Sequence, residues 1–282
     1  MLAHHASTRL QEQLDLAEKL WSQLATSRDN MLQDSNLNSM FPDEYIYPYT
    51  VWDFVRPAFF CPHDVERVGI LGDGGKNVCG MSRYERASPG PSSETNTARP
   101  LIVYSFGVDD DSSFEAELLR RTNAEIWGYD FSVDSWGPQI ASDYASRAHF
   151  AKVRLGNRTD TAHQPPSYTI QDLMHDNGHT YIDVLKIDVE GAEFDALDSF
   201  ISSLEGGNHG SYAPFPFGQL LMEVHIIPNG LDYTVPHDIY SWLNWWASLE
   251  RHGLREVYAE SNWLGDFILG RPRFKEASDT AH

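Results

Sequence analysis

The sequence predicts an α/β fold in which a doubly wound, mostly parallel sheet follows a helical N-terminal extension. From residue 101 onward, short apolar segments alternate with amphipathic ones, a pattern typical of parallel strands joined by crossover helices. The clearest strand is residues 181–188, a nearly continuous apolar run that ends in acids and a glycine. A chain of 282 residues with 41% hydrophobic content can bury the core of one such domain.

An amphipathic helix is predicted over residues 8–30, where apolar side chains recur at helical spacing. They are Leu10, Leu14, Ala17, Leu20, Trp21 and Leu24. We expect this helix to pack on the domain or on a second copy of the chain, which would form a homodimer. We divide the chain into an N-terminal extension with an aromatic-rich segment (1–60), the sheet domain (61–275) and a tail (276–282).

The remaining elements follow from apolar runs, helical periodicity and turn residues. Predicted strands cover residues 65–71, 101–106, 124–129, 150–155, 181–188 and 219–226, with 254–259 and 266–269 closing the sheet as an antiparallel pair. Predicted helices cover residues 112–121, 135–147, 169–175, the segment after Gly191, and 236–252. Residues 72–79 are a glycine-rich turn beside the sheet.

The formal net charge of −20 argues against nucleic acid and anionic membrane surfaces as partners, because both would be repelled. Cys61 and Cys79 are the two cysteines. They would pair in an oxidising compartment and remain buried thiols in a reducing one. No apolar run is long enough for a transmembrane helix, so we expect a soluble chain without membrane contact. A trimmed secretory leader or anchor is compatible with this sequence, and the compartment stays open.

Two turns indicate a ligand that carries adenosine but no phosphate. Gly107 follows the first central strand, and Asp109, Asp110 and Asp111 after it would repel a pyrophosphate. Asp130 ends the next strand, where an acid can accept hydrogen bonds from both ribose hydroxyls. S-adenosylmethionine meets both conditions, because its sulfonium and ammonium charges are positive. An NAD-dependent oxidoreductase would instead need a glycine-rich first turn.

The motif Asp183-Val184-Leu185-Lys186-Ile187-Asp188-Val189-Glu190-Gly191-Ala192-Glu193, followed by Leu221-Met222-Glu223-Val224-His225, resembles FkbM-type methyltransferases. The closest resemblance is to eukaryotic methyltransferase-like proteins with a Gly-Asp-Gly-Gly-Lys-Trp-Val-Cys segment, which here is residues 72–79 with Asn77 in place of tryptophan. Residues 104–107, 113–115 and 260–262 match further motifs in the same order.

This resemblance implies a Rossmann-like class I methyltransferase sheet with S-adenosylmethionine as methyl donor. The implied cofactor residues are Gly107, Val108, Ser113, Glu115, Asp130, Phe131, Asp73, Lys76 and Asp188. The resemblance also places residues 72–76 beside the cofactor as a lid or floor. A binding protein that has lost catalysis is the alternative, because the acidic turn departs from the family's pattern.

The acceptor side of the predicted site is a group of acids and one histidine. Asp188 and Glu190 share one strand face, and Glu223 and His225 share another, since side chains alternate along a strand. If the two strands are neighbours, these residues meet at the carboxyl edge of the sheet. His225, near its ordinary pKa, or Asp188 would be the general base, with Glu223 beside them, for a hydroxyl or amine of a small-molecule or peptide acceptor. Asp188, Glu223 and His225 could alternatively bind a divalent ion.

Overall fold

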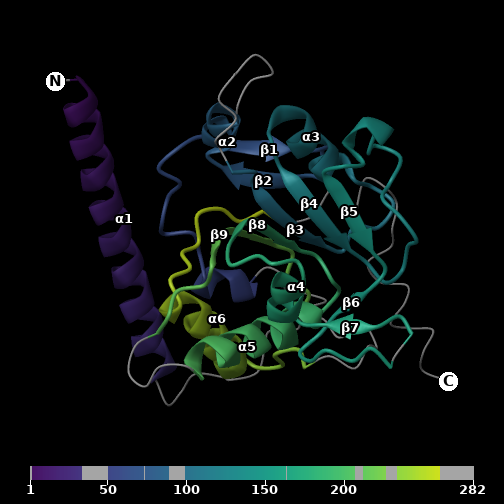
Figure 1. Cartoon of the computed structure of the whole chain (residues 1–282). Helices are drawn as coiled ribbons and strands as arrows, with labels where there is room; N and C mark the ends of the chain where they lie inside the picture. The colour runs from purple at the N-terminus through teal and green to yellow at the C-terminus, as the bar shows by residue number, and fades with distance from the viewer. Residues whose placement is uncertain are drawn as a thin grey trace.

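A computed structural model of the chain describes residues 2–33, 50–72, 74–88, 99–162, 164–206, 212–226 and 234–260 (Figure 1). All five strands of the central sheet are parallel. In spatial order they are β5 (Ala148–Ala151), β4 (Glu125–Tyr129), β3 (Ile102–Phe106), β8 (Ile182–Ile187) and β9 (Phe217–Met222). The predicted Rossmann-like α/β sheet is therefore confirmed.

Smaller strands and the helices surround this sheet. The strands are the antiparallel hairpin β1 (Val65–Val68) and β2 (Lys76–Cys79), and the parallel pair β6 (Arg154–Leu155) and β7 (Ser167–Tyr168). The helices are α1 (Leu2–Leu32), α2 (Met81–Ala87), α3 (Ser113–Arg121), α4 (Ile170–Asp176), α5 (Ala192–Glu205) and α6 (Ile239–Arg251), with 3-10 turns at Thr50–Phe54 and Ser142–Tyr144.

Side chains of alternate strand residues bury two separate cores, one on each face of the sheet. Tyr104 and Phe106 of β3 pack in the larger core with α4, α5 and α6. Val103 of the same strand packs in the smaller core with α2, α3 and the β1–β2 hairpin. Figure 1 shows this division, with the hairpin on one side of the sheet and α5 and α6 on the other. All six residues of β8 are buried, as its apolar run predicts.

The strand order places the topological switch point between β3 and β8. The connections after these two strands run to opposite faces, and in open α/β sheets ligands bind at the carboxyl ends of the strands at such a point. Phe106 pairs in register with Ile187, and Ile187 with Met222. The residues that follow all three strands therefore lie at one level of the sheet edge.

Helix α1 lies along one side of the domain and is fixed to α6 by polar contacts (Figure 1). Arg28 and Glu250 form a salt bridge with both side chains more than 90% buried. Trp21 donates its indole N–H to Glu250 at 3.1 Å, and the Arg255 guanidinium lies 3.5 Å from the centre of the Trp21 ring. The predicted amphipathic helix thus packs on its own domain. Among the described helices, none is both long and apolar enough to cross a bilayer.

Several predicted elements were wrong in kind or extent. Residues 135–147 form only a 3-10 turn, because Gly137 and Pro138 interrupt the segment and Gly137 packs against the backbone of Asp110. The strand predicted at 150–155 splits into β5 and β6, and Lys76–Cys79 adds a strand that was predicted as turn.

The predicted antiparallel closing pair is not present in the described part of the chain. Residues 254–259 form no strand, because Arg255 and Glu256 turn back to contact α1 and α6 instead of pairing with the sheet. Residues 266–269 lie outside the described residues. The strand predicted at 219–226 ends at Met222, so Glu223 and His225 stand beyond the paired part of the sheet.

The carboxyl of Glu256 should make folding stability fall as pH rises. Burial, followed by a hydrogen bond with Glu250, raises the pKa of Glu256 to about 7 from an ordinary 4.5. A carboxyl with a raised folded pKa stabilises the fold while it is protonated, so this contribution is full below pH 4.5 and is lost as pH rises through 7. We expect a loss on the order of 1–3 kcal/mol.

We therefore expect Glu256→Gln to be more stable than wild type at pH 8 and close to wild type at pH 5, as measured by urea denaturation. The exposed Glu12→Gln is the matched control and should follow wild type at both pH values. An unchanged pH dependence in Glu256→Gln would show that this carboxyl does not titrate with folding.

Candidate active site

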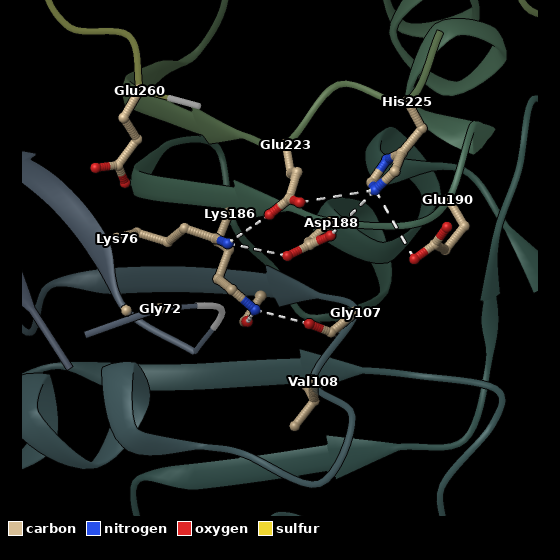
Figure 2. A network of polar contacts seen from close by, with 12 residues as sticks. Gly72, Lys76, Gly107, Val108, Lys186, Asp188, Glu190, Glu223, His225 and Glu260 are labelled. Atoms are coloured by element: carbon tan, nitrogen blue, oxygen red, sulfur yellow. Dashed lines mark hydrogen bonds and ion pairs between the residues drawn. The ribbon is translucent and has the colours of Figure 1, made fainter. Parts of the chain in front are cut away.

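The candidate site lies where β3, β8 and β9 end, and Figure 2 shows its side chains converging there. Asp188 directly follows β8, and its N–H donates to the Phe106 carbonyl at 3.0 Å. Glu223 directly follows β9, and its N–H donates to the Ile187 carbonyl at 2.9 Å. The backbone pairing thus continues one residue past each strand and holds both carboxylates at the sheet edge. The expected juxtaposition of the two strands is confirmed.

Lys76 reaches these carboxylates from β2 of the hairpin. Its Nζ lies 3.0 Å from Asp188 Oδ2 and 2.9 Å from Glu223 Oε2. Burial by itself would lower the pKa of Lys76, but the negative charges of Asp188 and Glu223 outweigh it and raise the pKa. Lys76 therefore remains an ammonium ion and links the hairpin to β8 and β9.

His225 completes a group that we call the acid–histidine cluster: Asp188, Glu190, Glu223 and His225. The Nε2 atom of His225 lies 3.8 Å from Asp188 Oδ1, 3.8 Å from Glu190 Oε1 and 4.0 Å from Glu223 Oε1. On the other side of the ring, Nδ1 lies 3.3 Å from Glu193 Oε1, which also accepts the backbone N–H of His225 at 2.7 Å.

The carboxylates around His225 determine its protonation. Burial would lower the pKa of this imidazole, but Glu193, then Glu190 and Asp188, raise it to about 9. The expectation of a histidine near its ordinary pKa was therefore wrong. At neutral pH the ring carries a proton unless another cation takes its place, so it is not a ready general base by itself.

The two carboxylates that Lys76 bridges have pKa values shifted in opposite directions. For Asp188, burial favours the neutral acid, but the charges of Lys76, Lys186 and His225 prevail and lower the pKa. For Glu223, burial and the negative charge of Asp188 raise the pKa. Two acids that share one cation separate in this way because both cannot be stabilised as anions equally.

The turn after β3 packs directly against the end of β8. A Cβ atom at Gly107 would lie 1.6 Å from the carbonyl oxygen of Asp188, and Gly107 has φ = 75°, so only glycine fits. The buried Lys186 donates to the Gly107 carbonyl at 2.7 Å. The predicted cofactor turn and the acid–histidine cluster are therefore in contact through the backbone.

Asp130 lies at the tip of β4 as predicted, but its carboxylate is already fully hydrogen-bonded. Oδ2 accepts the backbone N–H groups of Val108 at 2.8 Å and Asp109 at 3.0 Å. Oδ1 accepts the backbone N–H and the hydroxyl of Ser132, both at 2.7 Å. Burial opposes these bonds, which nevertheless lower the pKa of Asp130. Asp130 thus shapes the turn, and a ribose would have to take the place of the Ser132 hydroxyl.

Three other predicted cofactor residues, Ser113, Glu115 and Phe131, already have partners within the protein. Ser113 accepts the Ile70 N–H at 3.1 Å, and the fully buried Glu115 accepts the Ser105 hydroxyl at 2.5 Å. Phe131 follows Asp130, and the Arg154 guanidinium lies 4.4 Å from the centre of its ring. Asp73, the remaining predicted cofactor residue of the glycine-rich turn, lies outside the described residues.

The three aspartates after Gly107, Asp109 to Asp111, crowd the turn less than their composition suggests. Asp109 and Asp110 are exposed, while Asp111 accepts the Ser113 N–H at 3.0 Å near the start of α3. Gln139 donates to the second oxygen of Asp111 at 2.7 Å. One of the three carboxylates therefore accepts the first backbone N–H of α3, at a helix N-terminus where a negative charge is favourable.

Sequence reasoning missed the roles of Lys186 and Glu193. A lysine inside a fully buried strand was a visible signal, because a buried cation needs partners: it lies 3.6 Å from Glu115. Glu193 stands in the first turn of α5 with no exposed surface and contacts His225. An acid in a first helical turn is so common that this position offered no distinct signal.

Comparison with protein families identifies the family of the chain. A family model described as a methyltransferase domain (Methyltransf_22) matches residues 7–262. The chain belongs to this methyltransferase family. Its match runs from α1 through the whole described sheet, so the enzyme is a methyltransferase, as the cofactor turn and sheet predicted. No curated protein and no solved structure shows significant similarity to the chain.

A disulfide between Cys61 and Cys79 fastens the hairpin of this methyltransferase. Cys79 ends β2, three residues after Lys76, and exchanges two hydrogen bonds with the Gln219 side chain of β9, at 2.9 and 2.7 Å. The disulfide and Gln219 together fix the strand from which Lys76 reaches the carboxylates.

Removal of the disulfide by Cys61→Ala and Cys79→Ala together should lower the free energy of unfolding by about 3 kcal/mol, the chain-entropy value for a bridge of this span. The bridge closes a separation of 18 residues. Chemical denaturation of oxidised wild type and of the double variant measures the loss. Equal stability, or two free thiols in denatured and unreduced wild type, would contradict the assignment.

Proposed function

We propose that the chain transfers a methyl group from S-adenosylmethionine to a hydroxyl or amine of a small-molecule or peptide acceptor, as an FkbM-type enzyme would. The observation that carries the proposal is the direct contact between the Gly107 turn and Asp188 at the topological switch point. In a methyltransferase, this contact brings the proposed cofactor turn next to Asp188, Glu223 and His225. Among the described residues, these side chains are the group at that sheet edge that could act as bases or bind a metal ion.

The residues at the tip of β4 fit the adenosine part of the cofactor. The Ser132 hydroxyl donates to Asp130 Oδ1 at 2.7 Å, which is the same kind of bond that a ribose hydroxyl would make. Phe131 offers an aromatic face beside it, of the type on which an adenine ring can stack. The fit therefore requires one exchange of hydroxyl donors and leaves the backbone turn at Val108 and Asp109 unchanged.

When bound, S-adenosylmethionine supplies the methyl group, whose carbon–sulfur bond breaks with its electron pair left on sulfur as the acceptor's new bond to carbon forms. The acid–histidine cluster holds the acceptor beside this position and receives its proton. Lys76 keeps Asp188 and Glu223 oriented for that task. Most of the rate gain would come from this positioning. We favour a hydroxyl over an amine acceptor by analogy with the resembling family alone.

Calorimetry with S-adenosylmethionine, S-adenosylhomocysteine and NAD tests the donor class. We expect both adenosyl ligands to bind and NAD to give no heat, since Asp109 to Asp111 disfavour a pyrophosphate. If neither S-adenosylmethionine nor S-adenosylhomocysteine binds, the alternative is favoured, in which the protein keeps the fold and has lost catalysis.

Asp130→Ala should weaken S-adenosylhomocysteine binding by about 1.5–3 kcal/mol, because charge-assisted hydrogen bonds to the ribose are lost. The same change removes four hydrogen bonds that shape the turn, so the melting temperature should also fall.

Ser132→Ala is the matched variant that separates these effects. It frees one acceptor position on Asp130 and keeps the two bonds to Val108 and Asp109, so we expect equal or tighter ligand binding. If Ser132→Ala loses as much affinity as Asp130→Ala, the carboxylate acts on the turn alone and does not contact the ribose.

His225→Ala should reduce turnover by roughly 10²–10⁴, the scale of a lost acid–base or acceptor-activating group. Affinity for S-adenosylhomocysteine should stay near the wild-type value, because His225 contacts the carboxylates and not the Gly107 turn. Turnover per folded molecule, with methyl transfer followed on the acceptor, measures the effect. His237→Ala, at a histidine with 86% exposure, is the control. A stable His225→Ala enzyme with wild-type turnover would remove the cluster from catalysis.

A further inference from the structure

We propose that Asp188, Glu223 and His225 form a binding site for a divalent metal ion, with Glu190 as a further ligand at its open side. One ligand atom from each of the three residues lies within 4.8 Å of the others. They come from the ends of two adjacent parallel strands, so the sheet itself fixes their spacing. The site would take an ion that accepts both carboxylate oxygen and imidazole nitrogen.

Lys76 orients the carboxylates for this purpose. It contacts Oδ2 of Asp188 and Oε2 of Glu223, which leaves the other oxygen of each group, Oδ1 and Oε1, facing His225 Nε2 (Figure 2). Figure 2 shows Lys76 on one side of the two carboxylates and His225 on the other. Two lysine contacts therefore present two anionic oxygens toward one ring nitrogen.

The spacing of these atoms suits an ion better than direct hydrogen bonds. The Nε2–oxygen separations of 3.8, 3.8 and 4.0 Å exceed hydrogen-bonding distance, although the atoms attract one another when the ring is protonated. Atoms at such separations can share a centre about 2.2–2.4 Å from each, between the bond lengths typical of Mg²⁺ and Ca²⁺. The ligand atoms of Asp188, Glu223 and His225 are thus spaced as the ligands of one cation would be.

Glu193 supplies the outer contact that metal-binding histidines usually have. Its carboxylate is fully buried, lies 3.3 Å from Nδ1 of His225 and also accepts the Gly191 N–H at 2.8 Å. A carboxylate at Nδ1 fixes the ring orientation and favours the tautomer in which Nε2 presents its lone pair. In this protein, Nε2 is the ring atom that faces the three carboxylate oxygens.

Charge also favours an added cation. The carboxylates of Asp188, Glu190, Glu193 and Glu223 surround one lysine and one imidazole, while Lys186 is paired with Glu115. Among the described residues, these carboxylates outnumber the basic groups near them, even when Lys186 is counted with its partner Glu115. A partly buried group of acids of this kind favours a cation close by.

The mixed donor set selects the kind of ion. Carboxylates suit Mg²⁺, Ca²⁺ and Mn²⁺, and an imidazole shifts preference toward transition metals. Mn²⁺ satisfies both, and it accepts open positions for outside ligands. At this sheet edge, such a position would hold an oxygen of the acceptor and lower the pKa of its hydroxyl. This catalytic use rests on the proposed function, whereas ion binding does not.

Binding of Mn²⁺ alone to chelator-treated, full-length protein tests the site. Electron paramagnetic resonance counts free and bound Mn²⁺ without any cofactor or acceptor. We expect one ion per chain in wild type, and at least a tenfold weaker affinity in Asp188→Asn and in His225→Ala. Glu193→Gln should weaken binding about tenfold, the lower range for a lost outer contact. His175→Ala, at an exposed histidine, should bind as wild type does.

The outcomes separate this site from the proposed function. No Mn²⁺ binding by folded wild type, or binding retained in both Asp188→Asn and His225→Ala, would overturn the site. A loss of Mn²⁺ affinity in a variant supports the site only where the melting curve shows that the variant is folded. Glu223→Gln provides a further ligand variant if one of the others fails to fold. Mn²⁺ binding without S-adenosylhomocysteine binding would refute the methyl-donor proposal and leave the ion site standing.

Discussion

The bridge from Lys76 to Asp188 and Glu223 is the interaction on which the site depends. The two carboxylates follow neighbouring strands and are partly buried, so without a cation between them their charges would repel. The cation comes from a hairpin outside the central sheet. That hairpin is fastened in turn by the Cys61–Cys79 disulfide and by the hydrogen bonds of Gln219. An accessory element is therefore held in place so that one charge arrives at the sheet edge.

A second constraint is steric and concerns the turn after β3. Gly107 lies against the Asp188 carbonyl so closely that no side chain fits, and Asp130 gathers the backbone N–H groups of Val108 and Asp109. The turn is thus shaped before any ligand is present. Preorganisation of this kind reduces the ordering cost that binding must overcome.

The sequence was sufficient for the parts that depend on local pattern. The apolar run of β8 predicted a buried parallel strand, and alternation of side chains predicted that Asp188 and Glu223 would meet at one edge. Sequence patterns gave the wrong secondary structure where contacts between distant residues determine it. In residues 135–147, Gly137 and Pro138 already weaken a helix, and Gly137 also packs against Asp110, while residues 254–259 are held by α1 and α6.

The protonation of His225 shows the same limit in the chemistry of the site. Its ordinary pKa was a fair expectation for a histidine at a strand end, yet Glu193 from α5 and Glu190 from the turn before it change the result. Neither residue's distance from the ring can be read from spacing along the chain. Residue types predicted which groups could react, while only the fold shows which charges surround them.

The two halves of the site are braced by different parts of the chain, and this separation has a functional meaning. Asp130, itself bonded to Ser132, holds the predicted cofactor turn, whereas Lys76 and Glu193 hold the acid–histidine cluster. Among the described residues, the halves meet at the backbone of Phe106, Gly107 and Asp188 and through Lys186. Substitutions that reshape the cluster for another acceptor therefore need not disturb the turn. A sheet edge built in this way can keep one methyl donor while its acceptor changes.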